Sequence, residues 1–154
     1  MLGKFRRAVF AVTYAKTDKG IMYLLLKRKF HWRGWEFIKG GIDRGESKNS
    51  AVKREVFEET GNRPVKVTRF GFFGRYRYKR TLPDRKGLQG QSYSLYGAEI
   101  KFGNVKIDVK EHSGYEWLPF NEAVKRLTFK NQKKCLRIVD DWLGKNEKNK
   151  IQGN

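Results

Sequence analysis

The sequence is poor in the residues that mark secreted and membrane-bound proteins. It has one cysteine, Cys135, among 154 residues. A single cysteine excludes a disulfide within the chain and favours a reducing compartment. No stretch approaches the ~20 consecutive apolar residues of a membrane-spanning helix. We therefore expect a cytoplasmic protein with no membrane partner.

Acidic residues are also scarce. Asp and Glu number 16 against 35 Lys and Arg, which gives a net charge of +19. Such an excess attracts polyanions, including RNA, over a Debye length of roughly 8–10 Å, although a solubilising surface is the alternative explanation. Hydrophobic residues (38%) and aromatic residues (14%) are numerous enough for a buried core. The length fits one domain, which we place at residues 1–146, followed by a polar tail, 147–154, predicted to be frayed.

Apolar periodicity predicts strands, a helix, further strands and two closing helices. The predicted strands are 6–14, 22–29, 35–38, 65–78, 91–101 and 116–118, and the predicted helices are 47–60, 121–128 and 130–143. Asn121 is the expected N-cap of the second helix. Cys135 falls on an apolar position of the third, so we expect a buried thiol. This order predicts a mixed α/β layered domain.

Three glutamates share one face of the first predicted helix. Glu58 and Glu59 follow Glu55 by three and four residues and so lie beside it. Their carboxylates repel one another unless a cation compensates, and hard carboxylate oxygens suit Mg²⁺ or Mn²⁺. A solvated face with ion pairs to Lys53 or Arg54 is the alternative.

Residues around this helix can orient the acidic cluster. Glu46 precedes the helix and Arg54 lies within it, and such groups fix the geometry of metal ligands. Gly40, Gly41 and Gly45 permit a tight loop that turns Glu46 back towards the helix.

The whole segment resembles the Nudix box, G-x5-E-x7-R-E-U-x-E-E-x-G-U, where U is aliphatic. The matching residues are Gly40, Glu46, Arg54, Glu55, Val56, Glu58, Glu59 and Gly61. Asn62 replaces the last aliphatic residue, a departure that touches helix-end stability more than chemistry. The resemblance implies a Nudix α/β/α sandwich with a mixed sheet and a loop-helix-loop catalytic motif. It also implies hydrolysis of a nucleoside diphosphate linked to another group.

The resemblance carries roles to the matching residues. Glu55, Glu58 and Glu59 are the expected ligands of Mg²⁺, with Mn²⁺ as a possible substitute, and Glu58 is one candidate for the catalytic base. Glu46 and Arg54 support them. Lys39 precedes the loop and either neutralises charge developing on the phosphates or is a surface lysine.

Two further segments resemble particular Nudix branches. Residues 35–41, WEFIKGG, resemble the W-x-F-P-K-G segment of asymmetrical dinucleoside-tetraphosphate hydrolases, with Ile38 in place of proline. Residues 111–118, EHSGYEWL, resemble a segment that these enzymes share with bacterial RNA 5′-pyrophosphohydrolases. Gly90-Gln91-Ser92-Tyr93 resembles a strand start of the RNA-processing members.

By this resemblance Glu111 is a fourth acidic group at the metal centre, either a base or a further ligand, unless it is an ordinary loop glutamate. Glu99 is a weaker competitor. His112 is either a proton carrier or, in the interpretation we favour, a hydrogen-bonding loop residue.

Cations alternate with tyrosines just before the polar loop 79–90. The run is Arg75, Tyr76, Arg77, Tyr78, Lys79 and Arg80. Bases stack on aromatic rings while cations meet phosphates, which suits a nucleotide site or a single-strand groove. The alternative is a strand with inward aromatic and outward basic residues. Phe129-Lys130 resembles a family element that clamps a base, or simply joins two helices.

The leading hypothesis is hydrolysis of a dinucleoside polyphosphate such as diadenosine tetraphosphate. The runner-up is removal of pyrophosphate or a cap from an RNA 5′ end, and hydrolysis of a damaged nucleoside triphosphate comes third. A non-catalytic RNA-binding module is the alternative of another class. The intact set of Glu55, Glu58 and Glu59 argues against it, because a scaffold has no need of this repulsive cluster.

Overall fold

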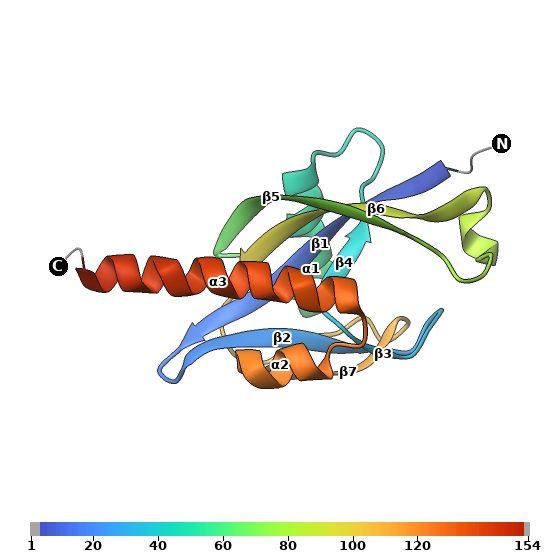
Figure 1. The fold of residues 1–154 in the computed structure, drawn as a ribbon. Coiled ribbons are helices and arrows are strands. Elements are labelled where there is room, and N and C mark those ends of the chain that lie inside the picture. Colours follow the sequence, from blue (N-terminus) through green and yellow to red (C-terminus); the bar gives the residue numbers. More distant parts are fainter. Residues whose placement is uncertain (1–3, 153–154) are drawn as a thin grey trace.

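The computed structural model describes residues 4–152, and the side chains of residues 4–146. In this part of the chain seven strands and three α-helices form one layered body (Figure 1). The strands are β1 (Lys4–Thr17), β2 (Gly20–Arg28), β3 (Gly34–Glu36), β4 (Ile38–Gly41), β5 (Lys66–Arg77), β6 (Leu88–Glu99) and β7 (His112–Leu118). The helices are α1 (Lys48–Thr60), α2 (Phe120–Arg126) and α3 (Lys130–Gln152).

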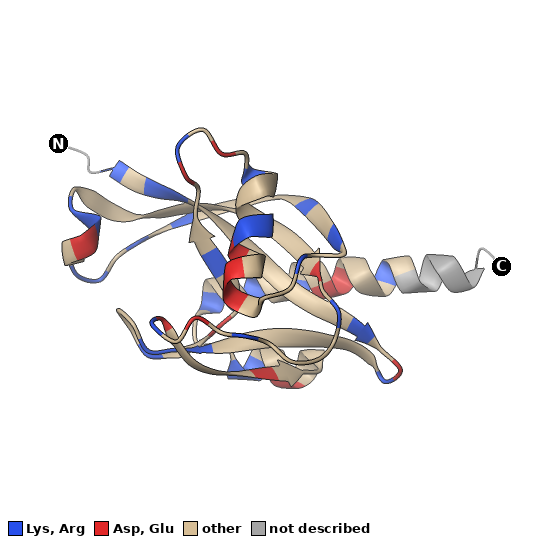
Figure 2. Ribbon diagram, turned by 180° about the vertical axis from the view of Figure 1, so that it is seen from behind, with Lys and Arg blue, Asp and Glu red and all other residues tan. Residues whose placement is uncertain are grey.

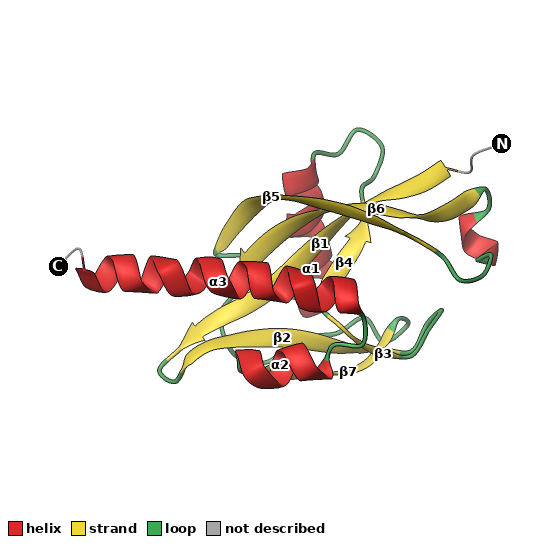
Figure 3. Cartoon of the chain, viewed as in Figure 1, coloured by secondary structure: helices red, strands yellow, loops and turns green. Residues whose placement is uncertain are grey.

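The sheet is mixed and it branches. Its main order is β3-β2-β1-β6-β5, with β1 parallel to β6 and the other pairs antiparallel. β1 pairs with β2 only over Tyr14–Thr17, next to the hairpin, and with β4 over Ala8–Ala11. Where β4 takes over, β2 diverges to pair with β3 and β7. The divergence leaves a junction between the two branches, next to which the site is built (Figure 3).

Helices cover both faces of the sheet, because alternate residues of β1 point to opposite sides. Phe10, Val12 and Tyr14 join one cluster, which includes Cys135 and Val139 of α3. Val9 and Ala11 of β1 join a second cluster with Val52 and Val56 of α1. The predicted α/β/α sandwich is therefore confirmed. Cys135 is fully buried, and burial raises its pKa to about 12, as expected of a structural thiol.

Both ends of α1 confirm the predicted helix 47–60. The Ser47 hydroxyl accepts a hydrogen bond from the Ser50 amide at 3.1 Å. Gly61 ends the helix with φ of 73°, a left-handed conformation that glycine adopts without strain. The Asn62 side-chain amide donates to the Thr60 carbonyl at 3.1 Å and to the Asn104 carbonyl at 3.4 Å. Asn62 thus ties the helix end to a neighbouring loop by polar contacts instead of aliphatic packing.

The predicted strand 35–38 was wrong in one respect, since it is two strands with different partners. Glu36 pairs with Leu26 of β2, whereas Ile38 pairs with Ala11 of β1. The chain crosses the junction at Phe37 and begins a new ladder. Gly40 and Gly41 are the last residues of β4, so the loop that leads to Glu46 begins after them.

Three other boundaries differ from expectation. Pro119, not Asn121, is the N-cap of α2, and no side chain caps that helix. α3 continues past the predicted end at residue 143 to Gln152, because Lys, Glu and Gln favour helix enough to offset Gly144. The predicted frayed tail is helical over 147–152, and residues 153–154 lie outside the described range. Among the described residues no helix is long and apolar enough to cross a membrane.

Candidate active site

Arg54 gathers four carboxylates from the loop and from α1, of which Asp43 is the most distant, at 3.4 Å from Nε. Its Nε and Nη2 donate to the two carboxylate oxygens of Glu46 at 2.8 and 2.9 Å. Its Nη1 donates to Glu55 at 2.8 Å and to Glu58 at 3.3 Å. Hydrogen bonding to Arg54 lowers the pKa of Glu46 to about 2. Arg54 therefore links Glu46 of the loop to Glu55 and Glu58 of α1.

Glu55 lies directly on the backbone of β4. A methyl group at Gly40 would overlap the Glu55 carboxylate, so only glycine leaves room for it. Burial, together with the nearby Glu58 and Glu59, raises the pKa of Glu55 to about 7 against the opposing effect of Arg54. A buried carboxylate with anionic neighbours is suited to a compensating cation. Acidic residues occupy the C-terminal half of α1 in Figure 2.

Glu59 turns away from Arg54 and joins a second, buried group. Its Oε2 lies 3.1 Å from His112 Nδ1, and His112 Nε2 lies 2.9 Å from Glu36 Oε2. Arg28 Nη1 lies 3.0 Å from the same Glu36 oxygen. Burial raises the pKa of Glu59. His112 is buried at the start of β7, so its expected place in a loop was wrong.

The charges around Glu36 set its ionisation. Burial disfavours the Glu36 anion, but Lys39, His112 and Arg28 outweigh this cost and lower its pKa to about 2. His112 responds in the opposite sense. Burial disfavours its cation, while Glu36 and Glu59 raise its pKa to about 9.

Lys39 is not a surface lysine, because its side chain is only 7% exposed. Its Nζ lies 3.6 Å from Glu36 Oε1 and 4.5 Å from the centre of the Trp32 ring. The rings of Tyr76 and Phe129 lie at 5.7 and 5.9 Å. Burial lowers the pKa of Lys39 to about 8 despite the attraction of Glu36.

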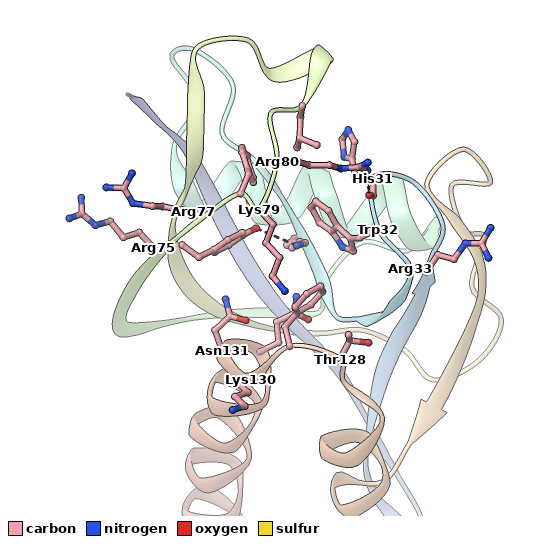
Figure 4. Close-up of a pocket in the computed structure, with 16 residues that line it drawn as sticks. His31, Trp32, Arg33, Arg75, Arg77, Lys79, Arg80, Thr128, Lys130 and Asn131 are labelled. Atoms are coloured by element: carbon pink, nitrogen blue, oxygen red, sulfur yellow. Dashed lines mark hydrogen bonds between the residues drawn. The ribbon is translucent and has the colours of Figure 1, made fainter. Parts of the chain in front are cut away.

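The aromatic rings around Lys39 belong to a cavity of about 690 Å³. Its described lining is aromatic and basic, without Asp or Glu, and comes from segments far apart in the chain: His31, Trp32, Arg33, Lys39, Arg75, Tyr76, Arg77, Tyr78, Lys79, Arg80, Leu82, Thr128, Phe129, Lys130, Asn131 and Gln132. Figure 4 shows Trp32 and Lys79 directed into this cavity, whereas Arg75 and Arg77 point away from it.

The alternating segment is a strand with inward tyrosines and outward arginines, and its tyrosines also line the cavity. Tyr76 lines the cavity, packs against the inner core and donates a hydrogen bond to Gln91 Oε1. Arg75 lies on the outer side, with its guanidinium 4.9 Å from the Phe5 ring. Tyr78 accepts a hydrogen bond from Arg85 at 3.0 Å. The tyrosines therefore face the cavity, and the cations between them form its outer rim.

The donor groups fit a divalent cation. Glu59, Glu111 and His112 each offer a ligand atom, all within 4.8 Å of one another. Glu59 Oε2 and His112 Nδ1 are buried without a hydrogen-bond partner among the described residues. Glu99 is not part of this site, because it pairs with Tyr14 at the other end of β1 and lies 3.9 Å from Lys16.

Comparison with known proteins gives the family. The NUDIX domain model matches residues 4–137. The chain belongs to the NUDIX family. Asymmetrical bis(5′-nucleosyl)-tetraphosphatase of Mus musculus is 31% identical over 124 residues, which cover 80% of this chain and 81% of that protein. As a Nudix hydrolase, the protein acts on phosphoanhydride bonds.

Two other relatives of this Nudix hydrolase are more distant. An RNA pyrophosphohydrolase of Sulfurovum sp. is 25% identical over 120 residues, covering 71% of this chain and 73% of that protein. The structure of a C. elegans Ap4A hydrolase in a binary complex superposes with a TM-score of 0.72 at 24% identity, covering 90% of this chain and 98% of that one. This structural likeness supports the fold.

Sequence reasoning missed four residues of the Nudix site: Arg6, Arg28, Trp32 and Glu36. Arg6 lies against Gly41, where a methyl group would overlap its guanidinium. Burial and the nearby Arg85 lower its pKa, and Glu55 opposes this shift. Among the described residues Arg6 has no hydrogen bond or ion pair. Arg28 and Glu36 could have been found from the sequence, because they are charged residues at the ends of apolar strands. A buried charge in such a place needs a buried partner.

Proposed function

We propose that this Nudix hydrolase cleaves dinucleoside polyphosphates, with diadenosine tetraphosphate as the leading substrate. One observation carries the proposal: the basic, aromatic cavity and the carboxylate helix meet at two consecutive residues. Lys39 lines the cavity, and the backbone of Gly40 lies against the carboxylate of Glu55. A nucleoside in the cavity would direct its phosphates past Lys39 towards α1.

The cavity suits a nucleoside with several phosphates. Trp32, Tyr76 and Phe129 offer rings for stacking a base. Lys39 lies beside the Trp32 ring, and Arg6 lies against Gly41 within the electrostatic influence of Glu55, so both cations could meet phosphate oxygens. Because both cations are partly desolvated, their attraction for phosphate is stronger than that of surface residues.

Glu55, Glu58 and Glu59 would hold the Mg²⁺ or Mn²⁺ that the family uses. When bound, such an ion screens phosphate charge and lowers the pKa of its water. Arg54 and Glu46 would hold Glu55 and Glu58 in place. Glu58 and Glu111 are the two candidates for the base that takes the proton from the attacking water.

A second substrate class has its own support. The outward-facing Arg75 and Arg77 continue the basic lining beyond the cavity, where the following phosphates of an RNA chain could bind. The Sulfurovum relative is named RNA pyrophosphohydrolase, whereas the mouse relative is named for dinucleoside tetraphosphates. The mouse protein matches more of the chain than the Sulfurovum protein and at higher identity, and this match supports the dinucleotide as the leading substrate.

A substrate panel tests the proposal. Diadenosine tetraphosphate, nucleoside triphosphates and 5′-triphosphorylated or capped RNA are compared at equal concentration with Mg²⁺ and with Mn²⁺, and the products are separated. We expect the highest kcat/KM for the dinucleotide, with two unequal nucleotide products. Faster cleavage of RNA, with binding that weakens with salt by about 0.7 log units per log unit for each phosphate contact, would instead select the second class.

A further inference from the structure

A histidine nitrogen and a carboxylate oxygen face each other beside the carboxylate helix. His112 Nδ1 and Glu59 Oε2 are 3.1 Å apart, and the two residues are 2% and 4% exposed. Neither atom has a hydrogen-bond partner among the described residues, so only the ion pair between them offsets their burial. Buried polar atoms without a partner are costly, so two of them converging on one point mark a place for a ligand.

The other side of the imidazole fixes which atom it offers. His112 Nε2 lies 2.9 Å from Glu36 Oε2. Arg28 at 3.0 Å and Lys39 at 3.6 Å keep Glu36 ionised, so its carboxylate can only accept a hydrogen bond. The proton of a neutral imidazole therefore sits on Nε2, and the lone pair of Nδ1 points towards Glu59. A histidine that donates to a carboxylate through one nitrogen and binds metal through the other is a recurrent arrangement.

A third donor comes from the residue before His112. The backbone carbonyl of Glu111 accepts hydrogen bonds from the amides of Lys29 at 2.9 Å and Phe30 at 3.4 Å, which fixes its position beside β2. The Glu111 carboxylate, the Glu59 carboxylate and the His112 imidazole each supply one ligand atom, and these atoms lie within 4.8 Å of one another. The three donors are close enough to converge on one ion with small side-chain adjustments.

We propose that His112 Nδ1, Glu59 and Glu111 bind one divalent transition-metal ion, with Glu36 orienting the imidazole. The inference rests on the proposed metal-dependent hydrolysis and adds a nitrogen ligand to its otherwise oxygen-based centre. Imidazole prefers Mn²⁺, Co²⁺, Ni²⁺ or Zn²⁺ to Mg²⁺, so this position selects the transition metals.

Mn²⁺ alone, without nucleotide, is the first probe. Electron spin-echo envelope modulation of the Mn²⁺-loaded protein should show coupling to an imidazole nitrogen, and ¹⁵N-histidine labelling should change it. The chain has two histidines, which provides a matched control. The coupling should disappear in His112→Gln and persist in His31→Gln. Bound Mn²⁺ without nitrogen coupling in the wild-type protein would overturn the proposal.

A second measurement uses the unaltered protein, in case His112→Gln does not fold. Long-range ¹H–¹⁵N spectra of the ¹⁵N-histidine protein are recorded during titration with Zn²⁺. The Nδ1 resonance of His112 should move on metal binding, while that of His31 stays in place. If His112 remains doubly protonated when the protein is saturated with metal, the nitrogen holds a proton and not the ion, and the proposal is wrong.

Affinity measurements test the selectivity and the role of Glu36. By calorimetry, His112→Gln should weaken Co²⁺ binding about 10–100-fold more than Mg²⁺ binding, and Glu36→Gln should weaken Co²⁺ binding about 10–100-fold. Equal losses for both metals in His112→Gln would overturn the ligand role. These experiments contain no nucleotide, so their failure leaves the proposed substrate untouched. Inactivity on the dinucleotide would likewise leave a nitrogen-ligated ion intact.

Discussion

The two halves of the active site are built in different ways. The carboxylate helix is local: its loop, its arginine and its glutamates lie within 22 consecutive residues, 40–61, and share one helix. The cavity is assembled from segments around residues 31–33, 39, 75–82 and 128–132. The first half is acidic and held rigid by Arg54, and the second is basic and aromatic. The proposed function assigns the reactive chemistry to the helix and recognition to the cavity. Substitutions should separate the two, with losses of kcat on one side and losses of affinity on the other.

The largest expected effect is on the helix. Glu58→Gln keeps the shape of the side chain but removes its charge, and should lower kcat by about 10²–10⁴-fold, as for loss of a base or a metal ligand. Nucleotide binding without metal should remain within twofold, measured by calorimetry. Glu122→Gln, at an exposed position of α2, is the matched control and should retain full activity. Unchanged turnover in Glu58→Gln would remove Glu58 from the catalytic group.

The next effect depends on the space at Gly40. In Gly40→Ala the new methyl group displaces the Glu55 carboxylate, which is the free end of a flexible side chain and can move. We expect kcat to fall about 10–100-fold, as for a small misplacement of a reacting group, with a melting temperature close to that of the wild type. Gly71→Ala is the control, because nothing lies within 4 Å of its added methyl group. Equal activities of the two variants would show that the position of Glu55 is not critical.

The cavity should respond through affinity. Phe129→Ala removes a stacking ring worth about 1–3 kcal/mol per base, so KM should rise about 5–150-fold while kcat stays within twofold. Phe73→Ala removes an exposed ring outside the cavity and should leave KM unchanged. A fall in kcat without a change in KM would contradict the division between chemistry and recognition.

The smallest effect concerns pH. The pKa of Lys39 is lowered by burial to about 8, so above that pH the side chain becomes neutral and loses its attraction for phosphate. KM should therefore rise by up to tenfold per pH unit above about 8. Lys39→Arg keeps its charge, and this rise should be absent in a pH series of steady-state rates. A wild-type KM that stays constant to pH 10 would exclude contact between the Lys39 cation and substrate.

The lowered pKa of Lys39 also makes the free energy of unfolding depend on pH. The unfolded chain holds the Lys39 proton up to pH 10.5, whereas the folded protein releases it near 8. More protons are bound in the unfolded state between these values, so the free energy of unfolding contributed by Lys39 rises with pH in that window. Lys39→Met should abolish this part of the pH dependence in urea unfolding.

How much the sequence could predict follows from the same comparison. The relative positions of Glu55, Glu58 and Glu59 follow from helix geometry alone, so their spacing in the sequence was sufficient to predict that they lie side by side. Trp32 and Phe129 meet Lys39 only because distant loops and strands come together, which no local pattern reveals. The alternation around Tyr76 gave two interpretations. The structure confirms the strand, and the nucleotide site remains a prediction that the position of the tyrosines in the cavity lining supports.

Polar residues inside the sheet were the hardest to place. His112 lies in a polar sequence that is typical of a loop, yet it is buried because β7 pairs with β2 opposite Arg28. Glu36 stands between two aromatic residues, and the two-strand crossing at Phe37 was not predicted. The partners of a buried charge depend on register between strands far apart in the sequence, and composition does not fix that register.

The parallel pair of β1 and β6 has a consequence for the order of folding. Phe10 of β1 lies opposite Leu95, 85 residues later, and this ladder extends along most of both strands. Contacts between residues so far apart form only after a large loss of chain entropy, which slows folding. During synthesis, the edge of β1 that pairs with β6 stays uncovered until β6 has left the ribosome. A nascent chain that stalls before residue 88 would expose an apolar strand edge, the kind of surface on which chains associate.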